Sequence, residues 1–296
     1  MRWLIILTAA RTLRLEDSQV RFVELGPTTT SPAPALTAAP GTTSPPAPSA
    51  LPAPTASNQS APWLFLHGLG GSLGDFAPLM LAAAEQQRVF ALDLPGFGGS
   101  ISLDADYSIA GYVHTLRQFA AAVGVTRFRF ICHSLGGQVC LGLALDAPSL
   151  VESLVLIDAA GSYDRKEYLE RLSRGTAGRV RPDRDPGISA LLHGDVEILR
   201  RLLDNEPVIL AALGSFRENY HNRLRDLHAP ALIIWGADDP IFPVAYAFFL
   251  KENIEGSVLR VVANAGHSPQ LSEPGLVLDW IREFHAGPTN GRELMP

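Results

Sequence analysis

A serine at position 134 stands where a strand-like run passes directly into a helix-like run, in the segment F-I-C-H-S-L-G-G at 130–137. A serine at such a junction lies on a tight turn, with its hydroxyl exposed and the next backbone N–H free at a helix N-terminus. Small residues two positions before and after the serine let the strand and helix backbones approach each other, as in the G-x-S-x-G nucleophile elbow. Cys132 replaces the first glycine of that pattern and Gly136 supplies the second. We therefore interpret Ser134 as a candidate nucleophile.

Two later loops carry the groups that a serine nucleophile requires. A serine hydroxyl is inert at neutral pH unless a base takes its proton and an acid orients that base. His267 lies in the loop N-A-G-H-S-P, after a strand-like run at 258–262. Asp238 and Asp239 lie in W-G-A-D-D-P, where a strand-like run at 231–235 ends. The chain order serine, aspartate, histidine is that of one class of hydrolases.

A glycine-rich segment, H-G-L-G-G-S at 67–72, supplies a fourth part. It directly follows the first strand of the expected parallel sheet. Its glycines allow a backbone N–H to turn toward the serine. We expect the amides of Leu69 and Leu135 to hold a developing oxyanion together.

These segments need a scaffold that brings several strand ends to one place. Short apolar runs alternate with segments of helical spacing, which predicts an α/β fold with a mostly parallel, twisted sheet and helices on both faces. Reactive loops in such a sheet lie at the carboxyl ends of the strands. A hairpin is expected at 12–15 and 19–24, further strands at 63–66, 88–92, 128–132, 154–157, 231–235 and 258–262, and helices at 109–123, 135–145 and 276–284.

With these motifs the chain resembles the α/β-hydrolase fold superfamily, as a serine hydrolase with a helical cap. The resemblance includes two further signatures, D-L-P-G-F-G at 93–98 and W-G-x-x-D-x-x-x-P at 235–243. It implies that Ser134 is the nucleophile, His267 the general base and Asp239, rather than Asp238, the orienting acid.

The same resemblance assigns the oxyanion donors to Leu69 and Leu135. It also leaves a reserve acid, because some members carry the acid at the end of an earlier strand. Asp158 follows the strand expected at 154–157 and occupies that place.

The domain organisation follows from changes in composition and from the resemblance. Residues 27–62 are nearly all Pro, Ala, Thr and Ser, with almost nothing large to bury, so we expect a flexible insertion. Residues 161–227 have amphipathic helical spacing and are expected to form a cap whose apolar side chains roof the pocket. The expected parts are an N-terminal segment and hairpin (1–26), the insertion (27–62), the first part of the core (63–160), the cap (161–227), the second part of the core (228–286) and a tail (287–296).

Composition excludes several classes of protein. The chain of 296 residues has 24 Lys and Arg against 30 Asp and Glu, a formal net charge of −6, which disfavours nucleic-acid binding. No run approaches the length of a membrane-spanning helix. No spacing of Cys and His resembles a zinc site, and Cys132 and Cys140 are expected to be buried, inert thiols. We therefore expect no metal and no cofactor. A cytoplasmic location is favoured, although the short apolar run after Arg2 resembles a minimal export signal.

The expected activity is hydrolysis of a carboxylic ester through an acyl-enzyme intermediate. The apolar face of the expected cap favours a small-molecule substrate with an apolar portion. Two alternatives remain open. A hydrolase of this fold that cleaves a carbon–carbon bond in a ring-cleavage product uses the same serine and chain order, and a non-catalytic binding protein of this fold generally lacks a triad residue. A serine at position 134 argues against haloalkane dehalogenases and epoxide hydrolases, whose covalent intermediate needs a carboxylate.

Overall fold

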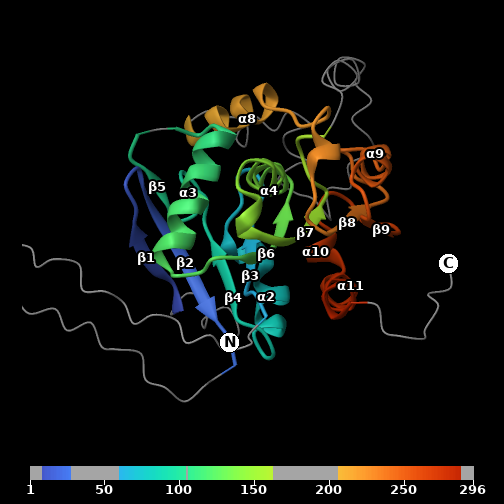
Figure 1. Cartoon of the computed structure of the whole chain (residues 1–296), viewed down its shortest axis with the longest axis horizontal. Helices are drawn as coiled ribbons and strands as arrows, with labels where there is room; N and C mark the ends of the chain where they lie inside the picture. Colours follow the sequence, from blue (N-terminus) through green and yellow to red (C-terminus); the bar gives the residue numbers. More distant parts are fainter. Residues whose placement is uncertain (1–8, 28–59, 105, 163–205, 288–296) are drawn as a thin grey trace, which may run out of the picture.

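A twisted sheet of nine strands forms the centre of the computed structural model, which describes residues 9–27, 60–104, 106–162 and 206–287 (Figure 1). The strands lie in the order β1-β2-β4-β3-β6-β7-β8-β9, and β5 pairs with β2. Every pair from β4 to β9 is parallel, whereas β2 is antiparallel to each of its partners. The predicted α/β fold with a mostly parallel sheet is confirmed.

The bounds of the elements are close to those expected from the sequence. The strands are β1 Arg11–Arg14, β2 Ser18–Leu25, β3 Trp63–Leu66, β4 Val89–Leu92, β5 Ile101–Ser102, β6 Phe128–His133, β7 Val151–Ile157, β8 Ala231–Gly236 and β9 Val258–Val262. The α-helices are α2 Ala77–Ala83, α3 Ile109–Ala122, α4 Leu135–Asp146, α8 Glu206–Arg217, α9 Ala245–Asn253, α10 Pro269–Ser272 and α11 Pro274–Ala286. Short 3-10 helices are η1 Leu73–Phe76, η2 Pro148–Leu150 and η3 Leu224–Asp226.

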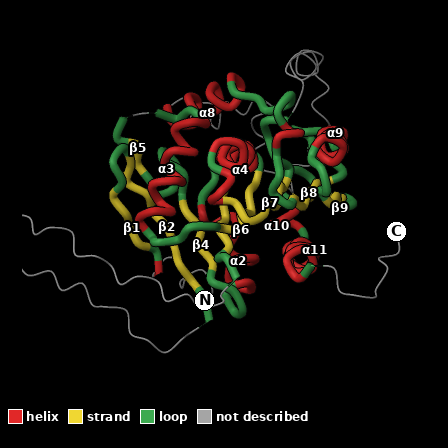
Figure 2. Tube along the Cα trace, in the orientation of Figure 1, coloured by secondary structure: helices red, strands yellow, loops and turns green. Residues whose placement is uncertain are grey.

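Buried side chains form one apolar cluster on each face of the sheet. Because side chains alternate along a strand, β3 sends Leu64 and Leu66 into one cluster and Trp63 and Phe65 into the other. The first cluster includes residues of α3, α4 and α9, and the second includes residues of α2 and α11. Helices therefore cover both faces of the sheet (Figure 2).

The sequence did not predict α2, α9, α10 or β5. Helix α2 has seven residues and β5 has two, so neither is long enough to show a clear periodic pattern. Within the described residues, no helix is long and apolar enough to cross a membrane. Most of the expected insertion and tail, and residues 163–205 of the expected cap, lie outside the described residues. Helix α8 belongs to the described end of the expected cap and lies above α3 and α4 in the view of Figure 1.

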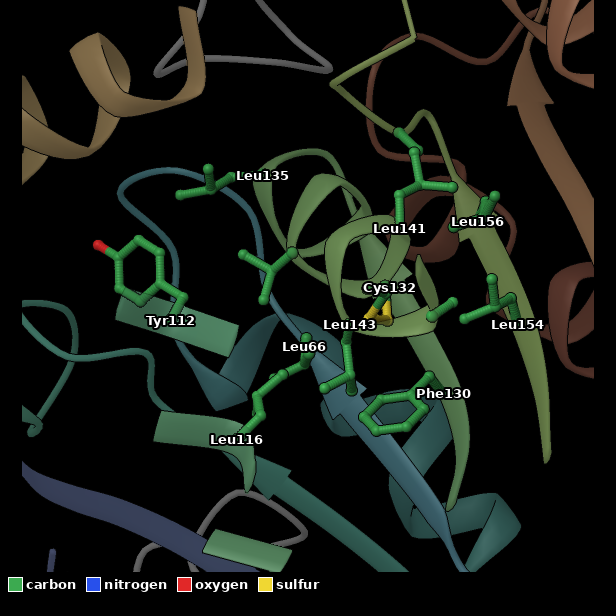
Figure 3. Close-up of a cluster of buried hydrophobic side chains, with 14 of the residues drawn as sticks. Leu66, Tyr112, Leu116, Phe130, Cys132, Leu135, Leu141, Leu143, Leu154 and Leu156 are labelled. Carbon is green, nitrogen blue, oxygen red and sulfur yellow. A yellow bond between two sulfur atoms is a disulfide. The ribbon is translucent and has the colours of Figure 1, made fainter. Parts of the chain in front are cut away.

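The expectation that both cysteines are free thiols is wrong. Cys132 in β6 and Cys140 in α4 form a disulfide, with a Cα–Cα distance of 6.7 Å (Figure 3). Both are fully buried, as expected, among apolar side chains. Only eight positions separate them, but the sharp turn between β6 and α4 folds the chain back on itself. The disulfide therefore cross-links the strand that precedes Ser134 to the helix that follows it.

Loss of this disulfide should lower the free energy of unfolding by about 2–3 kcal/mol, the loop-entropy value for so short a ring. The measurement is urea unfolding of the oxidised protein and of the double variant Cys132→Ala/Cys140→Ala. The variant is preferred to a mild reductant because both sulfurs are inaccessible to solvent. Two free thiols in the native protein by mass spectrometry, or equal stability of the two proteins, would contradict the expectation.

Candidate active site

Ser134 lies at the turn between β6 and α4 with a backbone φ of 50°, in the left-handed region that residues other than glycine rarely adopt. Its backbone N–H donates to the carbonyl of Ile157, and its own carbonyl accepts from Ala160, so the turn is tied to the end of β7. A Cβ at Gly136 would lie 2.6 Å from the carbonyl oxygen of Leu66, which explains the second glycine of the motif. The neighbouring strands therefore hold the strained turn in place.

The three polar side chains expected to act together do meet. Ser134 Oγ lies 3.0 Å from His267 Nε2, and His267 Nδ1 lies 2.8 Å from Asp239 Oδ2. All three residues are buried. Since a carboxylate can only accept, Nδ1 carries the imidazole proton and Nε2 is left as the acceptor for the serine hydroxyl. The arrangement can take a proton from Ser134.

The loop after β8 positions the carboxylate. Asp239 Oδ1 accepts the backbone N–H groups of Ile241 and Phe242 at 2.8 and 3.0 Å, while Oδ2 faces His267. The ring of Phe242 packs edge-on against the ring of His267, with centroids 5.5 Å apart. These contacts fix both ends of the carboxylate–imidazole pair. The neighbouring Asp238 is exposed to solvent.

A buried histidine holds the glycine-rich segment after β3. His67 Nε2 accepts the N–H of Leu94 at 2.9 Å, so Nδ1 carries the proton and donates to the carbonyl of Gly68 at 2.7 Å. The N–H of Gly71 donates to the same carbonyl at 3.1 Å. In a trans peptide the carbonyl and the following N–H point in opposite directions, so the Leu69 N–H is directed away from His67.

Gly68 also places this segment beside the elbow. A Cβ built on Gly68 would lie 3.0 Å from the Cβ of Ser134, so the two backbones are nearly in contact. Leu135 begins α4, and the first N–H groups of a helix have no partner within the helix. The structure therefore brings the segments of both expected amide donors next to Ser134.

Asp158, the reserve acid, is fully buried at the end of β7. Its Oδ1 accepts the N–H of Gly236 at 2.9 Å, and the Gly236 carbonyl accepts the N–H of Asp239. Asp158 thus supports the turn that carries Asp239. The carboxylate that lies 2.8 Å from His267 Nδ1 is that of Asp239.

Asp158, Asp239 and His267 are also the only group of three His, Cys, Asp or Glu residues in the described part of the chain whose ligand atoms all lie within 4.8 Å of one another. Two oxygens and an imidazole nitrogen suit a divalent cation in principle. However, His267 is already hydrogen-bonded on both ring nitrogens, to Asp239 and to Ser134. The hydrogen bonds favour a proton relay over a cation site.

Sequence reasoning did not find the supporting roles of His67 and Phe242, and for His133, which it interprets as structural, it did not find the partner. His133 donates from Nε2 to the carbonyl of His267 at 2.7 Å, a contact across 134 positions of sequence. His67 and His133 stand in the motifs that identified the site, but only the fold shows what their rings contact. Phe242 lies within the acid signature at a position that the signature leaves open.

Comparisons with known proteins agree with this architecture. The model of the alpha/beta hydrolase family matches residues 63–280. The chain is 28% identical to Rv2715 of Mycobacterium tuberculosis over 254 residues, which span 75% of this chain and 74% of the relative. It is 29% identical over 241 residues to RutD of Variovorax paradoxus, whose name provisionally assigns it carbamate hydrolysis, with 75% and 91% of the two chains covered.

A thermophilic esterase from Thermogutta terrifontis has the same fold. Its structure superposes with a TM-score of 0.67 at 21% identity, covering 94% of this chain and 98% of the esterase. At this level of identity the likeness establishes the fold alone.

Buried neutral histidines should make the fold sensitive to acid. Burial lowers the pKa of both His133 and His285 to about 3, and it also lowers the pKa of His67. A histidine in the unfolded chain has a pKa of about 6.5. Below that pH, these histidines are therefore protonated in the unfolded chain but stay neutral in the folded protein. The free energy of unfolding should fall as the pH falls from about 6.5 toward 3, by roughly 1.4 kcal/mol per pH unit for each such histidine.

Urea unfolding at several pH values checks this expectation. The variant His285→Gln isolates one histidine, because His285 packs in α11 against Ser153 near the start of β7, away from Ser134. Its curve of stability against pH should be flatter than that of the wild type by one histidine's contribution. Parallel curves for the two proteins would show that His285 is not a neutral group in the fold.

Proposed function

Because the chain belongs to the alpha/beta hydrolase family, we propose that it is a serine hydrolase that cleaves a carboxylic ester through an acyl-enzyme intermediate. The observation that carries the proposal is the hydrogen-bonded series Ser134, His267, Asp239, with distances of 3.0 and 2.8 Å. Family membership supports hydrolysis in general. The activated serine hydroxyl supports acyl transfer in particular.

In the first half-reaction His267 Nε2 takes the proton of the Ser134 hydroxyl as Oγ attacks the ester carbonyl. The carbonyl π electrons move to oxygen, and the backbone N–H groups of Leu69 and Leu135 stabilise the resulting oxyanion. Nε2–H then protonates the departing alcohol oxygen as the carbon–oxygen bond breaks. Asp239 holds the imidazole tautomer and stabilises the imidazolium.

In the second half-reaction a water molecule replaces the alcohol. His267 Nε2 removes a proton from the water, whose oxygen attacks the acyl carbon, and the same amides receive the second oxyanion. Collapse of the tetrahedral species returns the proton to Ser134 Oγ and releases the carboxylic acid. No group beyond the side chains, the two amides and water is needed.

Two apolar residues of the segments that form the site support a substrate with an apolar portion. Leu69 carries one of the two amides and exposes 42% of its own surface, and the Phe242 ring lies against His267. Apolar side chains that line a binding site bind an acyl chain or an aromatic group in preference to a charged one.

Ser134→Ala should abolish turnover of p-nitrophenyl esters, with kcat falling on the order of 10^4-fold or more because the attacking atom is removed. Labelling by a fluorophosphonate probe should disappear in the same variant. Thermal unfolding should change little, because the hydroxyl makes one hydrogen bond and the backbone turn is retained. Substantial ester turnover by the folded variant would contradict the proposal.

The identity of the acid is tested by two matched amides. Asp239→Asn should lower kcat on the order of 10^4-fold, because an amide cannot hold the imidazole in the required tautomer or stabilise its charge. Asp158→Asn should lower kcat less than about tenfold, because an amide oxygen can still accept the N–H of Gly236. The reverse ranking in steady-state assays would identify Asp158 as the acid.

A further inference from the structure

His133 is a buried histidine next to the nucleophile that the proposed reaction does not use. It is the last residue of β6 and exposes only 7% of its surface. Its ring centroid lies 4.9 Å from that of His267, and its Nε2 lies 2.7 Å from the backbone carbonyl oxygen of His267. A Cβ on Gly68 would lie 2.9 Å from its Nδ1. One ring thus contacts both the loop of the general base and the glycine-rich segment.

The hydrogen bond determines where the proton of this ring lies. A carbonyl oxygen can only accept, so His133 Nε2 carries the hydrogen. Burial and the neighbouring His267 lower the pKa of His133 to about 3, so the ring is neutral and Nδ1 is unprotonated. Nδ1 has no hydrogen-bond partner among the described residues. His133 therefore acts as a donor at one atom and takes no part in the proton path from Ser134 to His267.

We infer that His133 is a positioning residue, whose Nε2–H tethers the backbone of the general base His267 to the strand end that carries the nucleophile Ser134. The inference rests on the proposed function. The tether is short, since it runs from the residue adjacent to Ser134 to the carbonyl of His267 itself. The two residues that exchange a proton are consequently joined twice, once by the reacting atoms and once by a bond that persists when those atoms react.

The tether matters because the reacting distance is demanding. During acylation the hydrogen bond between Ser134 and His267 is lost, since the serine oxygen becomes part of the ester. A misplacement of about 1 Å in such a site can cost on the order of 100-fold in rate. A neutral donor also suits the place better than a cation, because His267 itself becomes positive and a second charge 4.9 Å away would oppose that change.

A glutamine and an asparagine at position 133 separate the tether from the rest of the ring. The amide of glutamine reaches about as far as imidazole Nε2 and can donate to the His267 carbonyl, whereas the amide of asparagine reaches only the place of Nδ1. His133→Asn and the apolar His133→Leu should lower kcat about tenfold or more, with KM within about twofold of the wild type. His133→Gln should recover most of the loss.

The matched control is His285→Gln. It replaces another histidine whose pKa is lowered by burial to about 3. Its contact is with Ser153, near the start of β7, so kcat should not change. All variants are assayed with a p-nitrophenyl ester, by the rate of fluorophosphonate labelling, and by thermal unfolding.

The outcomes are distinct. Wild-type kcat and labelling rate in folded His133→Asn and His133→Leu would overturn the tether, and so would equal losses in the glutamine and asparagine variants. If His133→Asn fails to fold, His133→Leu takes its place. Equal losses of kcat in His133→Gln and His133→Leu would then overturn the tether. Failure of the wild type itself to hydrolyse any ester or to react with the probe would instead refute the proposed function.

Discussion

The hydrogen bond from the Ser134 hydroxyl to His267 Nε2 spans 133 positions of sequence, and much of the architecture serves to bring these two atoms to 3.0 Å. Ser134 follows β6, Asp239 follows β8 and His267 follows β9. Because β6, β7, β8 and β9 pair in parallel, their carboxyl ends lie along one edge of the sheet. A slip of register by one residue would exchange the faces of a strand and separate the groups.

The elbow adds a second requirement. The left-handed backbone conformation of Ser134 costs free energy, so the surrounding structure must hold it in place. Bonds to Ile157 and Ala160 tie the turn to β7, and the close approach of α4 to Leu66 allows only glycine at position 136. The disulfide of Cys132 and Cys140 connects the two elements that meet at the turn. A cysteine where the motif has glycine is therefore part of the support of the turn.

Most of the sheet could be predicted from the sequence, because apolar strands and amphipathic helices leave a periodic pattern in local sequence. The residues that meet at the site could be predicted too, because each stands in a short motif with its own turn residues. The disulfide and the contacts of His67 and His133 could not. They depend on how far a turn folds back and on which carbonyl faces a ring, and both are set by packing between distant segments. The short elements α2 and β5 could not be predicted for a local reason, because they contain too few residues to show a periodic pattern.

Three buried histidines lie around Ser134, and their partners distinguish them where their residue type cannot. His67 holds a carbonyl of the glycine-rich segment and accepts a backbone N–H, and His133 holds the carbonyl of His267. Each uses its ring as a neutral backbone support, and burial lowers the pKa of both. Only His267 has a hydroxyl on one nitrogen and a carboxylate on the other. A ring can become positive in a buried site only where a carboxylate compensates the charge, so the place of Asp239 decides which of the three can act as a base.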